Sequence, residues 1–91
     1  MLRAGRTVSG LLVATCLLAT VACSAPPEKE IQQAKVAIEA AKTAGAEQYA
    51  REEFAAAKEA LTRADEAVTE RDYRLALSHA LDSREIGRAH V

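Results

Sequence analysis

Apolar residues recur three and four positions apart from residue 28 onward, and this spacing predicts helices almost throughout the rest of the chain. The pattern is interrupted twice, at residues 45–50 and at residues 71–72. We therefore expect an all-α fold whose helices cover about residues 28–44, 51–70 and 73–85.

Residues at the expected helix ends agree with these limits. Pro27 suits the first turn of a helix, and Glu28 places negative charge at the positive end of the helix dipole. Gly45 is a natural stop because glycine accepts a left-handed conformation without strain, and residues 46–50 would then turn the chain. Asp72 is suited to cap the third helix.

Each expected helix carries one apolar seam. The larger side chains assigned to these seams are Ile31, Ile38, Phe54, Leu61, Val68, Tyr73 and Leu77. Alanine fills most other seam positions; it favours helix strongly but buries little apolar area. We expect an alanine-rich antiparallel helical hairpin with a third helix. Asp72-Tyr73, Ala76-Leu77 and Ala80-Leu81 resemble the second helix of a tetratricopeptide repeat, which implies similar αα packing. The alternative is a coiled-coil oligomer.

The N-terminal segment has the pattern of a bacterial lipoprotein export signal. Arg3 and Arg6 precede residues 8–22, a stretch without a charge. This stretch has the length of a signal core and is shorter than the roughly 20 residues of a spanning helix. Small residues then lead to Cys23, as cleavage beside a lipid-bearing cysteine requires. Cys16 is a poorer candidate because a threonine precedes it.

This pattern predicts cleavage between Ala22 and Cys23. Residues 1–22 would be a removed signal-peptide helix, and residues 23–27 a lipidated cysteine with a short tether. Acyl chains such as palmitate add about 0.8 kcal/mol per buried methylene, so a multiply acylated cysteine would hold the protein on a membrane. Ser24, rather than aspartate, favours the outer membrane facing the periplasm over the inner membrane. An ordinary cleaved signal and an uncleaved anchor remain the alternatives.

The last residues, 86–91, are expected not to be native sequence. One choice of codons for residues 85–91 spells a widely used short-read sequencing adapter followed directly by a stop codon. We therefore expect adapter read-through, with the native frame continuing beyond about residues 83–85. The alternative is a short natural tail, and resequencing the locus distinguishes the two. Arg88 and His90 accordingly carry no functional argument.

The remaining residues, 23–85, show no pattern typical of catalysis. Adjacent polar pairs occur at Glu52 with Glu53, at Asp65 with Glu66 and at Ser78 with His79. Neighbours on a helix diverge by about 100°, so no such pair shares a substrate. Cys16 leaves with the signal and Cys23 is acylated, which leaves no thiol for a disulfide or a metal. We expect no enzyme activity, no cofactor and no metal site.

Charge and aromatic content argue against nucleic-acid binding. Residues 23–85 carry nine Lys or Arg against thirteen Asp or Glu, and the two signs are interspersed. The three aromatic residues, Tyr49, Phe54 and Tyr73, are too few for a base-stacking surface. We expect both tyrosines to cover the ends of the hairpin rather than to bind a ligand.

Two turns carry a resemblance to a known family. Ala44-Gly45-Ala46 followed by Tyr49-Ala50, an alanine-rich helix, and the Asp72-Tyr73 start of a further helix resemble the bacterial envelope family named domain of unknown function 4398. The resemblance covers about residues 31–82. It implies an exported, often lipidated, helical domain.

The chain departs from the family pattern at both turns. Arg51 stands where the family often has proline, and Arg71 where it often has glycine. These departures leave open whether the second and third helices are separate or continuous. Family members commonly extend further, some into a peptidoglycan-binding domain similar to outer-membrane protein A.

The sequence thus predicts a non-catalytic cell-envelope lipoprotein. Its helical domain would act as a scaffold or spacer, or would bind a protein partner or a second copy. Two alternatives stay open. The chain could be the N-terminal tether of a longer protein with a lost C-terminal domain, or a small peptide-binding or ligand-binding module that uses the groove between its helices.

Overall fold

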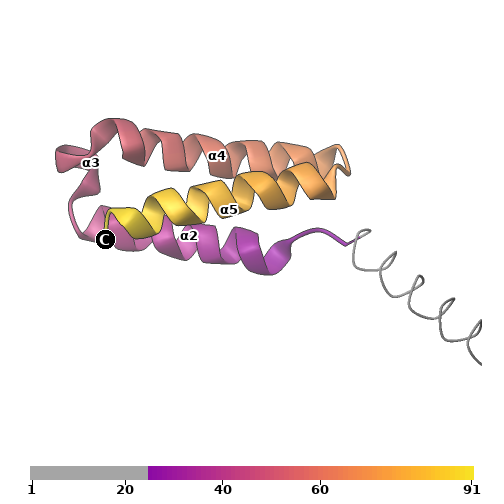
Figure 1. The fold of residues 1–91 in the computed structure, drawn as a ribbon, viewed down its shortest axis with the longest axis horizontal. Coiled ribbons are helices and arrows are strands. Elements are labelled where there is room, and N and C mark those ends of the chain that lie inside the picture. The colour runs from indigo at the N-terminus through magenta and orange to yellow at the C-terminus, as the bar shows by residue number, and fades with distance from the viewer. Residues whose placement is uncertain (1–24) are drawn as a thin grey trace, which may run out of the picture.

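The computed structural model describes residues 25–91, which form an all-α domain (Figure 1). Its helices are α2 (Glu28–Thr43), α3 (Ala46–Tyr49), α4 (Arg51–Thr69) and α5 (Tyr73–Ala89). The expected all-α fold of antiparallel helices is confirmed. None of the helices in these residues is long and apolar enough to cross a membrane.

The central helix of the bundle is α5. Consecutive long helices run in opposite directions, so α5 returns along the direction of α2 and lies between α2 and α4 (Figure 1). It packs along both of them, whereas the direct contact between α2 and α4 is much smaller. Helix α5 therefore holds α2 and α4 together, and α2 and α4 do not form the principal helix pair.

Helix α2 has charges that suit its dipole. Glu28 and Glu30 lie in the first turn and Lys42 in the last. The carbonyl of Pro27 accepts the first helical hydrogen bond from the amide of Ile31 at 3.0 Å. The helix ends one residue earlier than expected, at Thr43.

The segment after α2, where residues 46–50 were expected to turn the chain, makes this turn through a one-turn helix (Figure 1). Gly45 precedes it in the left-handed region, with φ of 89°. Ala46 is fully buried and belongs to the cluster that contains Ile38 and Phe54. Because Ala46 packs against this cluster, the backbone around it is close to the interior. One helical turn supplies hydrogen-bond partners for backbone amide and carbonyl groups there.

Helices α4 and α5 are separate, which answers the question that the sequence left open. The amide of Asp72 bonds to the carbonyl of Ala67 at 2.8 Å, and the amide of Arg71 bonds to that of Val68 at 3.0 Å. These two bonds form a Schellman motif, which ends a helix with a left-handed residue. Arg71 is that residue, with φ of 62°. The carboxylate of Asp72 then accepts a hydrogen bond from the amide of Leu75 at 3.2 Å and caps α5, as expected.

Replacing Arg71 by glycine is expected to raise the free energy of unfolding by about 0.5–1 kcal/mol, since a side chain in the left-handed region is strained and glycine is not. The midpoint of thermal unfolding, followed by circular dichroism, should rise by roughly 4–8 °C per kcal/mol. Arg74→Gly, inside the first turn of α5, is the matched control and should lower the midpoint. Midpoints that fall for both variants would contradict the expectation.

The interior of the bundle is built mainly from small side chains. Ile38 and Phe54 are its large buried residues. The buried alanines are Ala34, Ala37, Ala41, Ala46, Ala50, Ala57, Ala64, Ala67, Ala76 and Ala80. Small residues let the three long helices approach closely, so the core depends more on backbone proximity than on large apolar side chains.

Helix α5 continues past residue 85 to Ala89. Ile86 packs against the apolar cluster, and Gly87 approaches Ala37 so closely that an added Cβ would lie 2.9 Å from the Ala37 Cβ. The origin of these codons is a question about the gene, so adapter read-through over residues 86–91 stays a prediction.

Candidate functional site

The residues expected to carry the lipid anchor, Ala22 and Cys23, lie outside the described residues. Their cleavage and acylation remain predictions. The described chain begins at Ala25, and α2 begins at Glu28. The folded domain therefore starts within a few residues of the expected anchor.

The residues assigned to the helix seams differ in how deeply they are buried. Ile38 and Phe54 are 8% and 7% exposed and pack with Ala41, Ala46 and Ala57. The half-buried members of the set are Ile31, Leu61, Val68 and Tyr73. Of these, Leu61 packs against the same cluster.

The assignment of Leu77 to the seam is wrong, because this side chain is 37% exposed. Ala76 and Ala80 on the same helix, which packs on both α2 and α4, are fully buried. One residue along a helix is a rotation of about 100°, so a helix that buries Ala76 turns Leu77 toward its flank. Because α2 and α4 both approach α5 closely, the small alanine side chains fit in the interior and the larger leucine does not.

One buried polar residue, Ser83, was not foreseen from the sequence. Its hydroxyl donates a hydrogen bond to the carbonyl oxygen of Ala57, on α4, at 2.7 Å, and the residue is fully buried. The signal was present, since Ser83 continues the spacing of Ala76 and Ala80 on one face of α5. The bond links α5 to α4 in the interior.

A depression between α4 and α5 brings several titratable side chains together. Its lining includes Glu59, Arg63, His79 and Asp82. Arg63 is already paired with Glu59 at 2.7 Å, and both side chains are more than half exposed. Within residues 25–91, no three His, Cys, Asp or Glu residues are grouped so that they could hold a metal ion.

The two tyrosines lie at opposite ends of the bundle. Tyr49, in α3, is 59% exposed, and its hydroxyl donates a hydrogen bond to the carbonyl oxygen of His90. Tyr73 is half-buried at the start of α5. Because of this separation, the two side chains cannot contribute to one ligand site.

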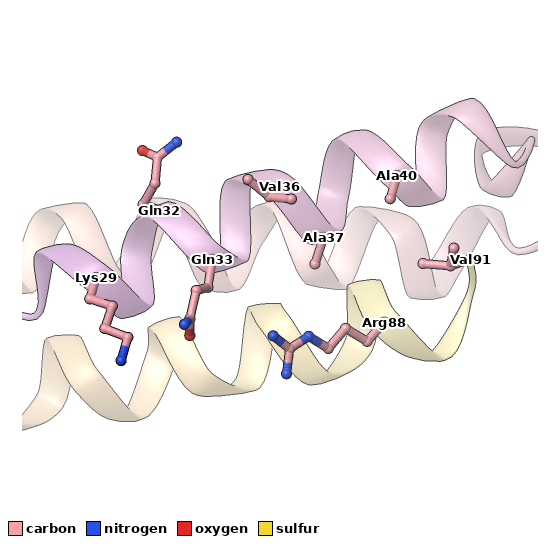
Figure 2. Close-up of a pocket in the computed structure, with 8 residues that line it drawn as sticks. All are labelled: Lys29, Gln32, Gln33, Val36, Ala37, Ala40, Arg88 and Val91. Carbon is pink, nitrogen blue, oxygen red and sulfur yellow. The ribbon is translucent and has the colours of Figure 1, made fainter.

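An apolar groove of about 440 Å³ follows the outer side of α2 beside the last turn of α5 (Figure 2). Val36, which is 60% exposed, and Ala40 line it from α2, while Arg88 and Val91 line it from the C-terminal segment. Arg88 and Val91 belong to residues 86–91, the segment that is expected not to be native sequence.

A second hollow, of about 550 Å³, lies where the tether meets the turn between α4 and α5. We call this region the tether end; it consists of Ala25, Pro26, Pro27, Glu30, Arg71, Asp72, Tyr73, Arg74 and Leu77. Figure 1 shows that the start of α2 and the turn from α4 to α5 lie at the same end of the bundle, away from α3. Residues more than forty positions apart therefore share one surface.

Comparison with known proteins identifies a family. Residues 29–85 match the family described as "Domain of unknown function (DUF4398)". No curated protein matches the chain, and no solved structure matches it. The match contains the motifs at both turns and covers α3, α4 and nearly all of α2. Because it spans more than half of the sequence, the chain belongs to the family named domain of unknown function 4398.

Proposed function

We propose that the protein is a non-catalytic cell-envelope lipoprotein, anchored through an acylated Cys23, with the outer membrane facing the periplasm as its location. The observation that carries the proposal is the order in which the signal features and the folded domain follow one another along the chain. Arg3 and Arg6, the uncharged residues 8–22 and Cys23 are followed almost at once by a folded domain. Such a short connection holds the domain beside the membrane.

The domain itself supports a role as a scaffold, spacer or protein-interaction module. Its three long helices pack through small side chains, which sets their separation, and its outer faces are mostly exposed and polar. The partner in this proposal is another envelope protein or a second copy of the chain. No nucleic acid or metal takes part.

Replacing Cys23 by alanine is expected to abolish lipidation. In an exporting bacterial host grown with an alkyne analogue of palmitate, the wild-type chain should carry the label and sediment with membranes. The variant should lose the label, because alanine has no sulfur atom to hold the glyceryl group that carries the labelled acyl chains. Cys16→Ala, which alters the other cysteine, is the matched control and should stay labelled. Undiminished labelling of the Cys23 variant would exclude this anchor.

The non-catalytic role is tested separately, with the lipidated protein purified in detergent. Incubation with isolated cell-wall material should release no soluble fragments above the level of a heat-denatured sample. Release that depends on folded protein would favour an enzyme instead.

A further inference from the structure

We propose that the tether end of the bundle docks on the phospholipid headgroups of the membrane that holds Cys23, with Arg71 and Arg74 binding the lipid phosphates. This inference rests on the proposed lipid anchor and adds an orientation: the bundle would stand with its tether end toward the bilayer and α3 away from it.

Chain length brings the tether end close to the membrane. Ala25, which lines the hollow, is two residues from Cys23. An extended chain spans at most about 3.6 Å per residue, so Ala25 lies within about 7 Å of the cysteine backbone. An acylated cysteine sits at the membrane surface, where its chains enter the hydrocarbon. The hollow must therefore lie beside the headgroups.

Arginine side chains at this surface match the chemistry of lipid phosphates. Arg71 and Arg74 are exposed, and neither forms an ion pair with another residue of the part that the structure describes. A guanidinium group offers a planar fork of donors that fits phosphate oxygens with two bonds. Arg71, whose backbone has the left-handed conformation, lies in the turn between α4 and α5 at the end of the bundle.

The apolar residues beside these arginines suit the boundary between headgroups and water. Leu77 is 37% exposed at the hollow, and Tyr73 is half-buried next to it. A leucine and a tyrosine flanked by arginine are typical of surfaces that rest on a bilayer. Contact with lipid would cover Leu77, which the helix packing leaves in water.

The acidic residues at this end limit the strength of the contact. Glu30 and Asp72 line the same hollow as the arginines, and Glu70 precedes Arg71 in the chain. Asp72 is also the cap of α5. The net field of this end is therefore not strongly positive. Docking depends on the anchor, which turns a weak contact into an intramolecular one at high effective concentration. We expect the same chain without acyl groups not to bind vesicles.

The contact can be measured on the mature lipidated protein, reconstituted in vesicles of phosphatidylethanolamine and phosphatidylglycerol. A fluorescent probe is attached to Leu77→Cys, and a second sample carries the probe on Gln48→Cys, an exposed position in α3. Acylation blocks Cys23, so each variant has one free thiol. We expect the neutral quencher acrylamide to quench the probe at position 77 several-fold less than the probe at position 48.

Charge reversal tests the role of the arginines. Combining Arg71→Glu with Arg74→Glu should raise quenching at position 77 to the level found at position 48. The matched control, Lys42→Glu with Arg51→Glu, makes the same change in charge at the far end and should leave the shielding intact. Circular dichroism of both double variants shows whether the bundle remains folded. If the Arg71→Glu, Arg74→Glu double variant does not fold, the two single variants are measured in its place.

Two results would overturn the inference, and they differ from failure of the anchor. Equal quenching at positions 77 and 48 in acylated protein with both arginines present would refute the proposed headgroup contact without contradicting the anchor. Shielding that survives the charge reversal removes the phosphate-binding role of the arginines. An intact mass without acyl chains, together with loss of flotation with vesicles, removes the anchor and the contact with it.

Discussion

Replacing Phe54 by alanine is expected to leave the domain largely unfolded. Phe54 is the one aromatic residue buried within residues 25–91, and it joins α4 to Ile38 of α2 and to Ala46 of α3. Removing a buried phenylalanine side chain costs about 3–5 kcal/mol. A domain of this size rarely has more than about 3–5 kcal/mol of stability in total. The alanine-rich core has few other large side chains that could fill the space.

The measurement is far-ultraviolet circular dichroism of the variant at 25 °C and during heating. Leu75→Ala is the matched control, because Leu75 is a large apolar residue of α5 that is 42% exposed. It should change the free energy of unfolding by no more than about 0.5 kcal/mol, as surface substitutions usually do. A Phe54→Ala variant as stable as the Leu75→Ala variant would mean that the cluster does not hold the helices together.

Replacing Ala80 by leucine is expected to destabilise the domain by about 1–3 kcal/mol, because the added carbon atoms have no room. Ala80 is fully buried on α5, the helix that packs on both sides. The apolar pattern alone suggests the opposite result, since leucine would thicken a thin seam. The result therefore shows whether the close approach of the helices is the reason that the core contains mainly small side chains.

The matched control is Ala55→Leu on the exposed face of α4. It makes the same chemical change without crowding, so the thermal midpoint should stay within a few degrees of the wild-type value. The Ala80→Leu variant should instead melt well below both. Equal or higher stability of Ala80→Leu would show that the bundle has space which the close packing of α5 does not suggest.

Much of the fold could be predicted because its signals are local. Gly45 ends α2, and Asp72 caps α5 with its own side chain, as expected from residue type alone. The helix limits followed from these signals together with the apolar spacing. Arg71 shows the limit of such signals, since the turn forms there without the glycine that it prefers.

The sequence was less informative where two helices pack on different sides of a third. Leu77 was assigned to the buried side of the third helix together with Ala76 and Ala80. The structure buries the two alanines and Ser83, but α5 is covered from two sides and Leu77 is 37% exposed. The expected hairpin with a third helix did not specify which helix is central, and the structure shows that α2 and α4 each pack chiefly on α5. Helical periodicity marks an apolar face without stating how many neighbours cover it.

The sequence by itself indicated the approximate limits of the three long helices, because these limits depend on residues that are neighbours in the chain. The anchor at Cys23 stays a prediction from the same kind of local pattern. Only the tertiary structure decided that α5 is central, that alanines rather than Leu77 fill the core, and that Arg71 and Arg74 lie beside the tether. These features depend on the distances between helix backbones, which arise from packing of the whole bundle. No local pattern of residue types specifies those distances.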